Sequence, residues 1–268
     1  MTMPTSAMPA TGSPTALATR ADGRYPARAG RLSYGTAIGV LMLECNIPFV
    51  PGDVGNASTY DFPVQYHLVP GATGDAVIVR QDPALIPVFI EAAQHLVSQG
   101  VRAITGDCAY MGAYQQAVAE AVEVPVFLSS LMQVQLVQAM LRPDDKLAVL
   151  VANGQTVGDR LLEPVGITGA IRDRCVFRGL EDKPSFRESI LEESGELDVA
   201  AIEAEMVATA TELVEQDPSI GAFLLECSDM PPYSAAIQRA TGLPVFDWIG
   251  FINYVQHAVV RTPYRGFF

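Results

Sequence analysis

From Thr36 onward, apolar and polar positions follow two patterns, one typical of strands and one typical of helices. Six short runs are mainly apolar, and the first of them is continuous, as is typical of a parallel strand buried on both faces. They lie at 37–43, 101–105, 125–128, 146–152, 223–225 and 244–246. Helical patterns separate them, the first over 84–98 with Gly100 as its end signal. Strands that alternate with helices predict an α/β fold with parallel sheets flanked by helices.

Three segments depart from this alternation. Residues 46–74 are rich in Pro, Gly and Asn, so we expect a loop there. A loop of this length inside a compact domain is often functional. The stretch around Cys175 is expected to be irregular, and the acidic stretch 181–217 is expected to be a solvent-facing helical segment.

The two halves of the chain repeat each other without gaps at a shift of 119 positions, which places Cys108 on Cys227. The same shift matches Met111 with Met230, Tyr114 with Tyr233, and Pro125-Val-Phe127 with Pro244-Val-Phe246. This register predicts a duplicated α/β lobe, with the active site in the cleft between two pseudo-symmetric copies. We expect an N-terminal lobe over 34–144 and a C-terminal lobe over 145–268. The sequence leaves open whether the closing helix of each lobe packs on the other lobe.

Cys108 and Cys227 each lie between a predicted strand and a predicted helix. Ligands of open parallel sheets bind at the carboxyl ends of the strands, so facing lobes would place the two thiols across one cleft. One thiolate can then remove a proton from carbon while the opposite thiol delivers one. A helix N-terminus would favour the thiolate form. Cys45 and Cys175 have no counterpart in the repeat and are expected to be packing residues.

The residues directly after the two cysteines are candidates for substrate binding. Backbone N–H groups of Ala109, Tyr110, Ser228 and Asp229 would lie at helix starts, where they can hold a carboxylate. Helix capping is an equal alternative for the side chains of Ser228 and Asp229. Asp107 and Glu226 precede the cysteines, and we expect them to be structural.

The net charge of −13 argues against nucleic acid or an anionic membrane as a partner, and no apolar stretch is long enough to predict a membrane span. Three scattered histidines and the absence of a CxxC pair predict no metal site. No glycine-rich phosphate loop occurs, so a nucleotide cofactor is not expected. Four widely spaced cysteines suit free thiols and a cytoplasmic location. Residues 1–33 are expected to be a disordered tail, with an organelle-targeting segment as the alternative.

Three motifs resemble the aspartate/glutamate and hydantoin racemase superfamily over residues 37–258. They are Gly106-Asp-Cys-Ala-Tyr-Met111, Leu225-Glu-Cys-Ser-Asp-Met230 and the turn Asn153-Gly-Gln-Thr156. The resemblance implies that Cys108 and Cys227 transfer protons next to the carboxylate of a small substrate, with no cofactor. It further implies that Asn153 and Thr156 bind that carboxylate, with Asn56 as a candidate from the first lobe, and that the protein is a homodimer or higher homo-oligomer.

The residues beside the cysteines depart from the common amino-acid racemases, which have Asn-Thr or Thr-Glu there. With the loop that runs from Pro51 to Pro63, this departure resembles a divergent branch similar to algal-type dimethylsulfoniopropionate lyases. In that branch the same base expels dimethyl sulfide by β-elimination. Candidates for contact with a sulfonium cation, or alternatively for core packing and capping, are Tyr110, Tyr233, Trp248 and Asp229.

Three functions follow as hypotheses. The first is a racemase or epimerase of an amino-acid-like substrate, such as aspartate, glutamate or a hydantoin. The second is a lyase that releases dimethyl sulfide and acrylate. The third, from another class, is a small-acid binding protein, which would need no reactive thiol.

Overall fold

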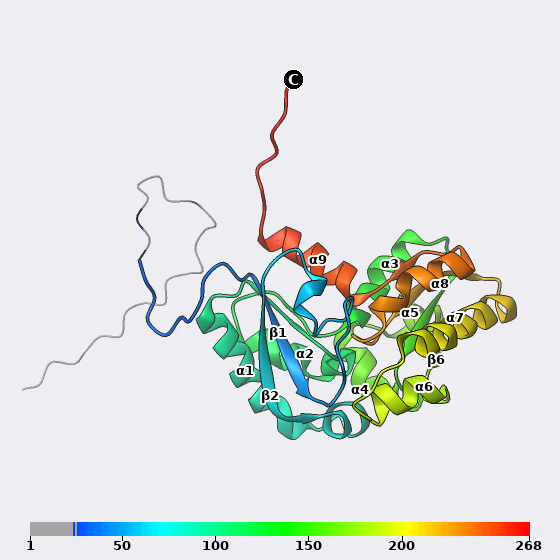
Figure 1. The fold of residues 1–268 in the computed structure, drawn as a ribbon. Helices are drawn as coiled ribbons and strands as arrows, with labels where there is room; N and C mark the ends of the chain where they lie inside the picture. The colour runs from blue at the N-terminus through cyan, green and yellow to red at the C-terminus, as the bar shows by residue number, and fades with distance from the viewer. Residues whose placement is uncertain (1–23, 25) are drawn as a thin grey trace, which may run out of the picture.

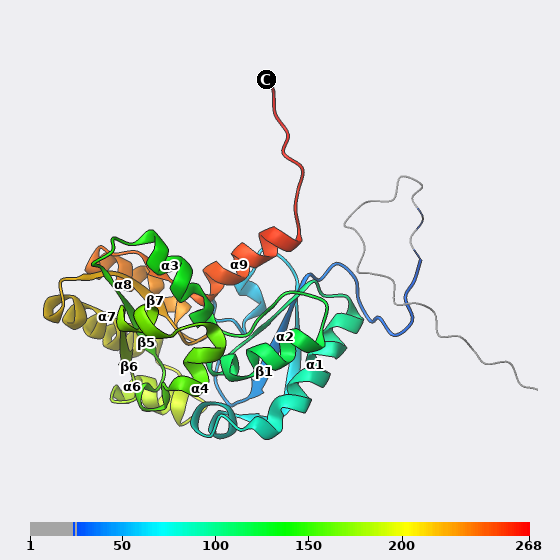
Figure 2. The ribbon, with the colours of Figure 1, turned by 180° about the vertical axis from the view of Figure 1, so that it is seen from behind.

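The computed structural model describes Arg24 and residues 26–268, which form two α/β lobes beside each other (Figures 1 and 2). Most of the expected tail, 1–33, lies outside the described residues. The described part of that tail runs without helix or strand along the first lobe. Its Leu32 N–H donates to Gln99 Oε1 (3.2 Å), and Gln99 Nε2 donates back to the Gly30 carbonyl (2.9 Å).

The first lobe has a four-stranded sheet in the order β2-β1-β3-β4, and neighbouring strands pair in parallel. Its strands are β1 (Ile38–Glu44), β2 (Val64–Thr73), β3 (Ala103–Gly106) and β4 (Val126–Phe127). The helices in this half of the chain are α1 (Ile86–Gln99), α2 (Gln115–Ala121) and α3 (Val134–Met140). The central strand β1 is apolar throughout its buried part, as a strand covered on both faces requires.

The second lobe repeats this topology as β6-β5-β7-β8, again parallel. Its strands are β5 (Lys146–Val151), β6 (Cys175–Gly179), β7 (Ile220–Leu225) and β8 (Val245–Phe246). Its helices are α4 (Asp159–Leu162), α5 (Gly169–Asp173), α6 (Pro184–Phe186), α7 (Val199–Gln216), α8 (Ser234–Thr241) and α9 (Trp248–Val259). The predicted α/β class with two parallel sheets is therefore confirmed. Within the described residues, no helix combines the length and apolar character needed to cross a membrane.

Two edge strands were missed by the hydrophobic pattern. The loop expected over 46–74 is wrong for its second half, because Val64–Thr73 pairs with β1 as the edge strand β2. The irregular stretch expected around Cys175 is wrong too, because β6 begins there. Edge strands are only half buried, so their apolar periodicity is weak, and an edge position tolerates Pro70 where the β1–β2 register shifts.

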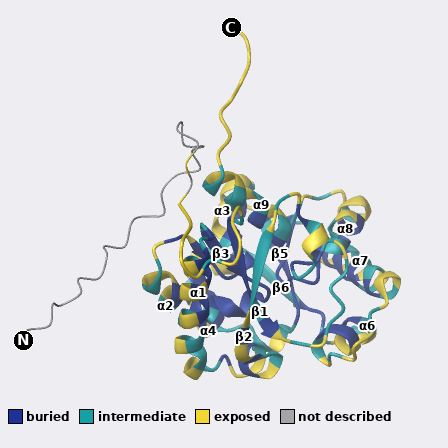
Figure 3. Ribbon diagram, turned by 60° about the vertical axis from the view of Figure 1, so that its left-hand side comes forward, coloured by how far each residue is buried: buried dark blue, intermediate teal, exposed yellow. Residues whose placement is uncertain are grey.

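Each lobe packs against a helix from the other half of the chain. α3 follows β4 but packs on β5, while α9 follows β8 but packs on β3 and lies between the lobes in Figures 1 and 2. Trp248 of α9 is fully buried, and its indole N–H donates to Thr105 Oγ1 (3.1 Å). The rings of Phe251 and Phe127 meet edge to face at 5.1 Å. Buried segments form the interior of both lobes in Figure 3, while the outer helices are exposed.

Because α9 completes the core of the first lobe, we expect one cooperative unfolding transition. Trp248 is the chain's one tryptophan, so its fluorescence reports the docking of α9. In urea, fluorescence and far-ultraviolet circular dichroism should follow the same curve, and Trp248→Ala should lower the unfolding free energy by about 3–5 kcal/mol. Trp248→Phe keeps a buried ring, so it should lower the unfolding free energy by less. Two separated transitions in the wild type would contradict this packing.

Candidate active site

The two repeated cysteines follow the middle strands β3 and β7 at their carboxyl ends. The chain turns in the same way after each, because Met111 N–H donates to the Cys108 carbonyl (2.9 Å) and Met230 N–H to the Cys227 carbonyl (3.2 Å). The backbone N–H two residues on also reaches each sulfur, that of Tyr110 toward Cys108 and that of Asp229 toward Cys227. The repeat read from the sequence therefore extends to the hydrogen bonds around both thiols.

Both thiols line one narrow cavity of about 30 Å³ between the lobes. Its apolar and uncharged wall consists of Leu43, Cys45, Ile47, Phe49, Gly74, Ile78, Tyr110, Ala152, Ile190 and Ser228. Its acidic wall consists of Asp107, Glu193, Glu226 and Asp229. Each of the two cysteines is 6% exposed. A cavity of this size holds about one water molecule, so an organic substrate enters only when the walls move apart.

Two equivalent π-turns, Asp75–Val79 (η2) and Arg187–Leu191 (η8), form opposite walls of the cavity. Each is closed by an N–H five residues on, from Arg80 to Asp75 and from Glu192 to Arg187. Each contributes its fourth residue, Ile78 or Ile190, to the cavity. The pair of turns thus brings one isoleucine from each lobe against the thiols.

A left-handed residue follows each π-turn, Gln81 at φ 45° and Glu193 at φ 51°. Both reach across to the loop after the other lobe's central strand. Gln81 Nε2 donates to the Thr156 carbonyl (3.1 Å), and Glu193 Oε2 accepts from Asn46 N–H (2.9 Å). Two cross-lobe contacts therefore close over the cavity, related by the same pseudo-symmetry as the cysteines.

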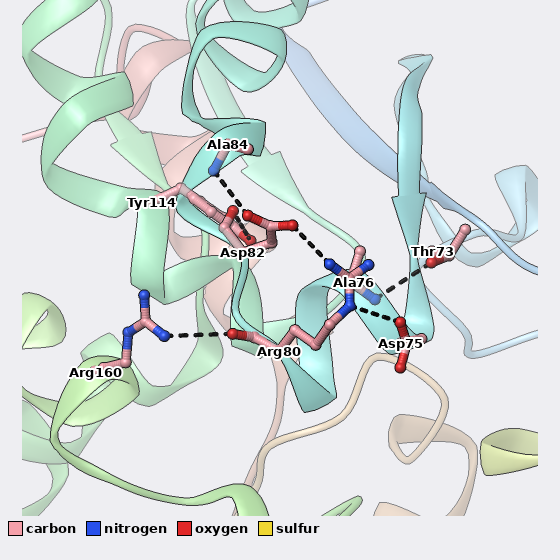
Figure 4. A network of polar contacts seen from close by, with 8 residues as sticks. All are labelled: Thr73, Asp75, Ala76, Arg80, Asp82, Ala84, Tyr114 and Arg160. Atoms are coloured by element: carbon pink, nitrogen blue, oxygen red, sulfur yellow. Dashed lines mark hydrogen bonds and ion pairs between the residues drawn. The ribbon is translucent and has the colours of Figure 1, made fainter.

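Figure 4 shows the polar contacts that hold the first π-turn. Arg80 bonds to Asp75 (2.7 Å) and Asp82 (2.6 Å), and its carbonyl accepts from Arg160 of the second lobe (3.3 Å). The Tyr114 hydroxyl donates to the Asp82 carbonyl (3.1 Å). In the second π-turn the charges are reversed, since Arg187 stands first and pairs with Glu192 (3.3 Å).

Asp107 and Glu226, the residues before the cysteines, clamp the central strands. Both Asp107 oxygens accept from Leu43 N–H (3.1 and 3.0 Å), and Glu226 Oε2 accepts from Ala152 N–H (3.0 Å). Burial raises the pKa of each carboxyl to about 8, against the opposing effect of these hydrogen bonds. These contacts support the structural role expected for both residues.

A second pair of buried carboxyl groups, Asp53 and Asp229, lies beside Cys227. Burial raises the pKa of both carboxyl groups, and the contact between them raises the pKa of Asp53 further while it opposes the rise for Asp229. Asp229 Oδ2 in turn accepts from the Cys227 thiol at 3.2 Å. Asp53 was not among the predicted site residues, although it lies in the loop that was expected to be functional.

The charges of the site oppose thiolate formation in the free protein. Burial raises the pKa of Cys108 and Cys227 well above the ordinary value, and the nearby Asp and Glu side chains raise it further. The expected stabilisation by a helix N-terminus is too small, because each cysteine precedes an irregular or 3₁₀ turn and receives one backbone N–H. No Lys, Arg or His lines the cavity among the residues that the structure describes.

The structure brings some of the predicted binding residues to the cavity and places others behind it. Tyr110, Ser228 and Asp229 line it. Asn153 and Thr156 lie one layer back: the Tyr110 hydroxyl donates to the Asn153 carbonyl (2.6 Å) and accepts from Thr156 Oγ1 (3.0 Å).

Two further predicted residues do not line the cavity. Ala109 is fully buried in the turn after Cys108. Asn56 lies in its own loop, where its side chain bonds to Ser58 N–H (2.9 Å) and to the Phe49 carbonyl (2.8 Å).

The cavity residues that sequence reasoning missed come from segments outside the ungapped repeat. The two halves of the chain match at different shifts in different segments, because the connecting loops differ in length. The shift is 119 residues for the turns after the cysteines, 112 for the π-turns and 109 for the strands β1 and β5. Ile78 and Ile190 are the one identical pair between 75–82 and 187–194, a signal too weak to detect alone. Cys45, expected to be a packing residue, also lines the cavity.

Within the described chain, no three His, Cys, Asp or Glu side chains are grouped so as to hold a metal ion.

The raised carboxyl pKa values predict how stability depends on pH. A carboxyl whose pKa is higher in the folded state stabilises the fold fully below its unfolded value and loses that contribution as pH rises through the folded value. For Asp107 and Glu226, this stabilisation is lost between about pH 4 and about pH 8. The unfolding free energy in urea should therefore fall by at least about 1 kcal/mol between mildly acidic and mildly alkaline pH, the equivalent of one pKa unit.

Asp107→Asn and Glu226→Gln keep a hydrogen-bond acceptor but remove the charge, so each should reduce this loss of stability. The exposed Asp159→Asn serves as the control and should leave the pH dependence unchanged. A wild type that gains stability over the same window would contradict the electrostatics of the site.

Known proteins resemble the chain at two levels. No protein-family model matches it. The dimethylsulfoniopropionate lyase of Durusdinium sp. clade D is 31% identical over 237 residues, which cover 86% of this chain and 77% of that protein. Dimethylsulfoniopropionate lyase 3 of Emiliania huxleyi (strain CCMP1516) is 32% identical over 237 residues, again 86% of this chain. The chain spans only 61% of that relative's length.

Solved structures of low identity share the fold. An allantoin racemase from Klebsiella pneumoniae has a TM-score of 0.61 at 13% identity, covering 83% of this chain and 88% of that one. Unliganded arylmalonate decarboxylase has a TM-score of 0.53 at 18% identity, covering 86% and 95%. An aspartate racemase homologue from Pyrococcus horikoshii OT3 has a TM-score of 0.52 at 16% identity, covering 83% and 99%. The chain therefore belongs to the dimethylsulfoniopropionate lyase family, which here is built on the racemase fold.

Proposed function

We propose that the chain is a lyase that splits dimethylsulfoniopropionate into dimethyl sulfide and acrylate. The observation that carries this proposal is the charge of the cavity. Acidic side chains surround the thiols and no basic side chain lines the described cavity, which suits a substrate with a cationic end. Aspartate and glutamate bring two carboxylates each, which these walls would repel. The names of the family's relatives support the same substrate.

The proposed reaction is a β-elimination that starts with a cysteine. A thiolate removes a proton from the carbon next to the substrate carboxylate, the electron pair forms the C=C bond, and the C–S bond breaks. Dimethyl sulfide leaves as a neutral molecule, so the leaving group needs no proton. The reaction releases acrylate and one proton overall. Loss of the sulfonium charge weakens the attraction between product and acidic wall, which favours product release.

The substrate carboxylate needs hydrogen-bond donors in an acidic cavity. We assign this role to the backbone N–H groups of Tyr110, Ser228 and Asp229, residues that line the cavity beside the two thiols. Asn153 and Thr156 then act through Tyr110, because they hold its hydroxyl by hydrogen bonds. The apolar walls at Ile78 and Ile190 suit the two S-methyl groups.

Racemisation is the second candidate, and the pseudo-symmetry of the thiols favours it. Each cysteine has the same turn and the same N–H toward its sulfur, as a reaction that protonates either face of a carbon would require. Incubation with aspartate, glutamate and hydantoins in D₂O separates the two candidates. Deuterium at the α-carbon, together with no dimethyl sulfide from the sulfonium substrate, would favour the racemase.

Headspace gas chromatography tests the lyase proposal directly. The wild type should release dimethyl sulfide and acrylate in equal amounts. Cys227→Ser should lose at least about 10²-fold in turnover, the lower end of the contribution of a general base. Cys175→Ser is the matched control, because Cys175 lies on edge strand β6 outside the cavity, and it should stay within about twofold of the wild type. No dimethyl sulfide at saturating substrate would refute the proposal.

The acidic wall also predicts charge selectivity in binding. The trimethylammonium analogue 3-(trimethylammonio)propionate should inhibit at least about tenfold more strongly than its uncharged isostere 4,4-dimethylpentanoate, a difference of about 1.4 kcal/mol. The two molecules have the same shape and the same carboxylate, so the comparison isolates the cation. Equal inhibition constants would show that the acidic residues do not recognise the substrate's charge.

A further inference from the structure

We propose that the two thiols have unequal roles: Cys227 is the base, Asp229 is the catalytic residue that takes the Cys227 proton, and Asp53 positions Asp229. This division of roles deepens the proposed lyase function and rests on it for the identity of the substrate. The contacts that support it belong to the protein alone, so they can be tested without any substrate.

The first support is the contact between thiol and carboxylate. The Cys227 thiol donates to Asp229 Oδ2 at 3.2 Å, within reach for proton transfer between sulfur and oxygen. Asp229 is 7% exposed, and its other oxygen, Oδ1, has no hydrogen-bond partner among the described residues. A buried carboxylate oxygen without a partner is costly to maintain, which is a common mark of a functional group.

The second support is the asymmetry of the repeat. The residue equivalent to Asp229 is Tyr110, two positions after Cys108. Its phenol donates to the Asn153 carbonyl at 2.6 Å and has no hydrogen bond to the Cys108 sulfur among the described contacts. In the described structure, Cys108 has no hydrogen bond to a carboxylate, so only Cys227 has a proton acceptor.

The third support is the way Asp53 holds Asp229. The side chain of Asp53 contacts that of Asp229, and this contact raises the pKa of Asp53 and opposes the rise that burial causes in the pKa of Asp229. Gly55 N–H fixes Asp53 Oδ1 at 2.6 Å, and Val54 N–H donates to the Ser228 carbonyl at 3.4 Å. The loop that carries Asp53 is therefore attached to the turn that carries Cys227.

The fourth support is the lack of another base. Imidazole is the usual partner of a reactive thiol, but none of the three histidines lines the cavity. His67 and His95 stack on each other at 4.5 Å, and His257 lies near the end of α9. A carboxylate is the remaining acceptor for the Cys227 proton.

The proton count closes over one turnover. The Cys227 S–H proton moves to the Asp229 carboxylate, and the thiolate takes the α-proton of the substrate as the C–S bond breaks. Dimethyl sulfide and acrylate leave, Cys227 is again a thiol, and Asp229 carries one extra proton. That proton passes to solvent and restores the starting state.

Alkylation of the thiols by iodoacetamide at neutral pH provides the test, because two explanations of the Cys227–Asp229 contact predict opposite signs. If Asp229 accepts the proton, Asp229→Asn should slow alkylation of Cys227 at least about tenfold. If Asp229 acts only as a nearby negative charge, its removal lowers the pKa of the thiol and speeds alkylation. Peptide mass spectrometry reports each cysteine separately in the full-length chain.

Cys175, which lies outside the cavity, serves as the internal reference, and its alkylation rate should stay within about twofold. Asp229→Glu should recover at least half of the lost Cys227 rate, since it restores the acceptor, whereas a variant that merely disturbs packing would not be rescued. Asp53→Ala should slow the alkylation of Cys227 less than Asp229→Asn does. An equal or faster Cys227 rate in Asp229→Asn, with circular dichroism like that of the wild type, would overturn the proposal.

The outcome is independent of the lyase assay. If Asp229→Asn slows alkylation of Cys227 but the wild type releases no dimethyl sulfide, the thiol–carboxylate pair is supported and the substrate is refuted. If the wild type releases dimethyl sulfide but Asp229→Asn speeds alkylation of Cys227, the substrate is supported and the thiol–carboxylate pair is refuted.

Discussion

The burial of several carboxyl groups around two thiols is the constraint on which the site depends. Asp107, Glu226 and the Asp53–Asp229 pair lie under or within the cavity wall, and no basic side chain lines the described cavity. Uncompensated buried charge is costly, and this protein reduces it with backbone N–H donors and with raised pKa values that keep carboxyl groups protonated. A sulfonium cation would supply the compensation that the chain lacks. On the proposed function, substrate and site are complementary in charge, and binding of the cation would favour the thiolate.

Duplication supplied two equivalent thiols, and single substitutions made them different. The turns after Cys108 and Cys227 share their backbone hydrogen bonds, yet the second residue of each turn is a phenol in one lobe and a carboxylate in the other. The phenol bonds to a backbone carbonyl, whereas the carboxylate bonds to the thiol. An elimination needs one base and no proton donor on the opposite face, so this asymmetry suits a lyase better than a racemase.

The narrow form of the cavity follows from the way the lobes are joined. Helices α3 and α9 each complete the other lobe, which ties the two sheets together at one side. Around the cavity, Tyr110 and Arg160 also bond across the lobes. Gln81 and Glu193 each bond to a loop of the opposite lobe through backbone groups. Both residues hold left-handed backbone conformations that non-glycine residues rarely adopt. The lobes are therefore joined both through α3 and α9 and through the loops around the thiols.

Much of the fold and the identity of the cysteine pair were determined by the sequence alone. Mainly apolar runs predict β1, β3, β5 and β7, since buried parallel strands need apolar side chains on both faces, and the ungapped match between Cys108 and Cys227 selects the pair. The edge strands β2 and β6 were hidden, because half-exposed strands have little periodicity. The tertiary structure alone decided the role of Asp53, the cross-lobe contacts of Gln81 and Glu193, and the raised pKa of both thiols. Each of these depends on residues far apart in the chain, and on burial that no local pattern encodes.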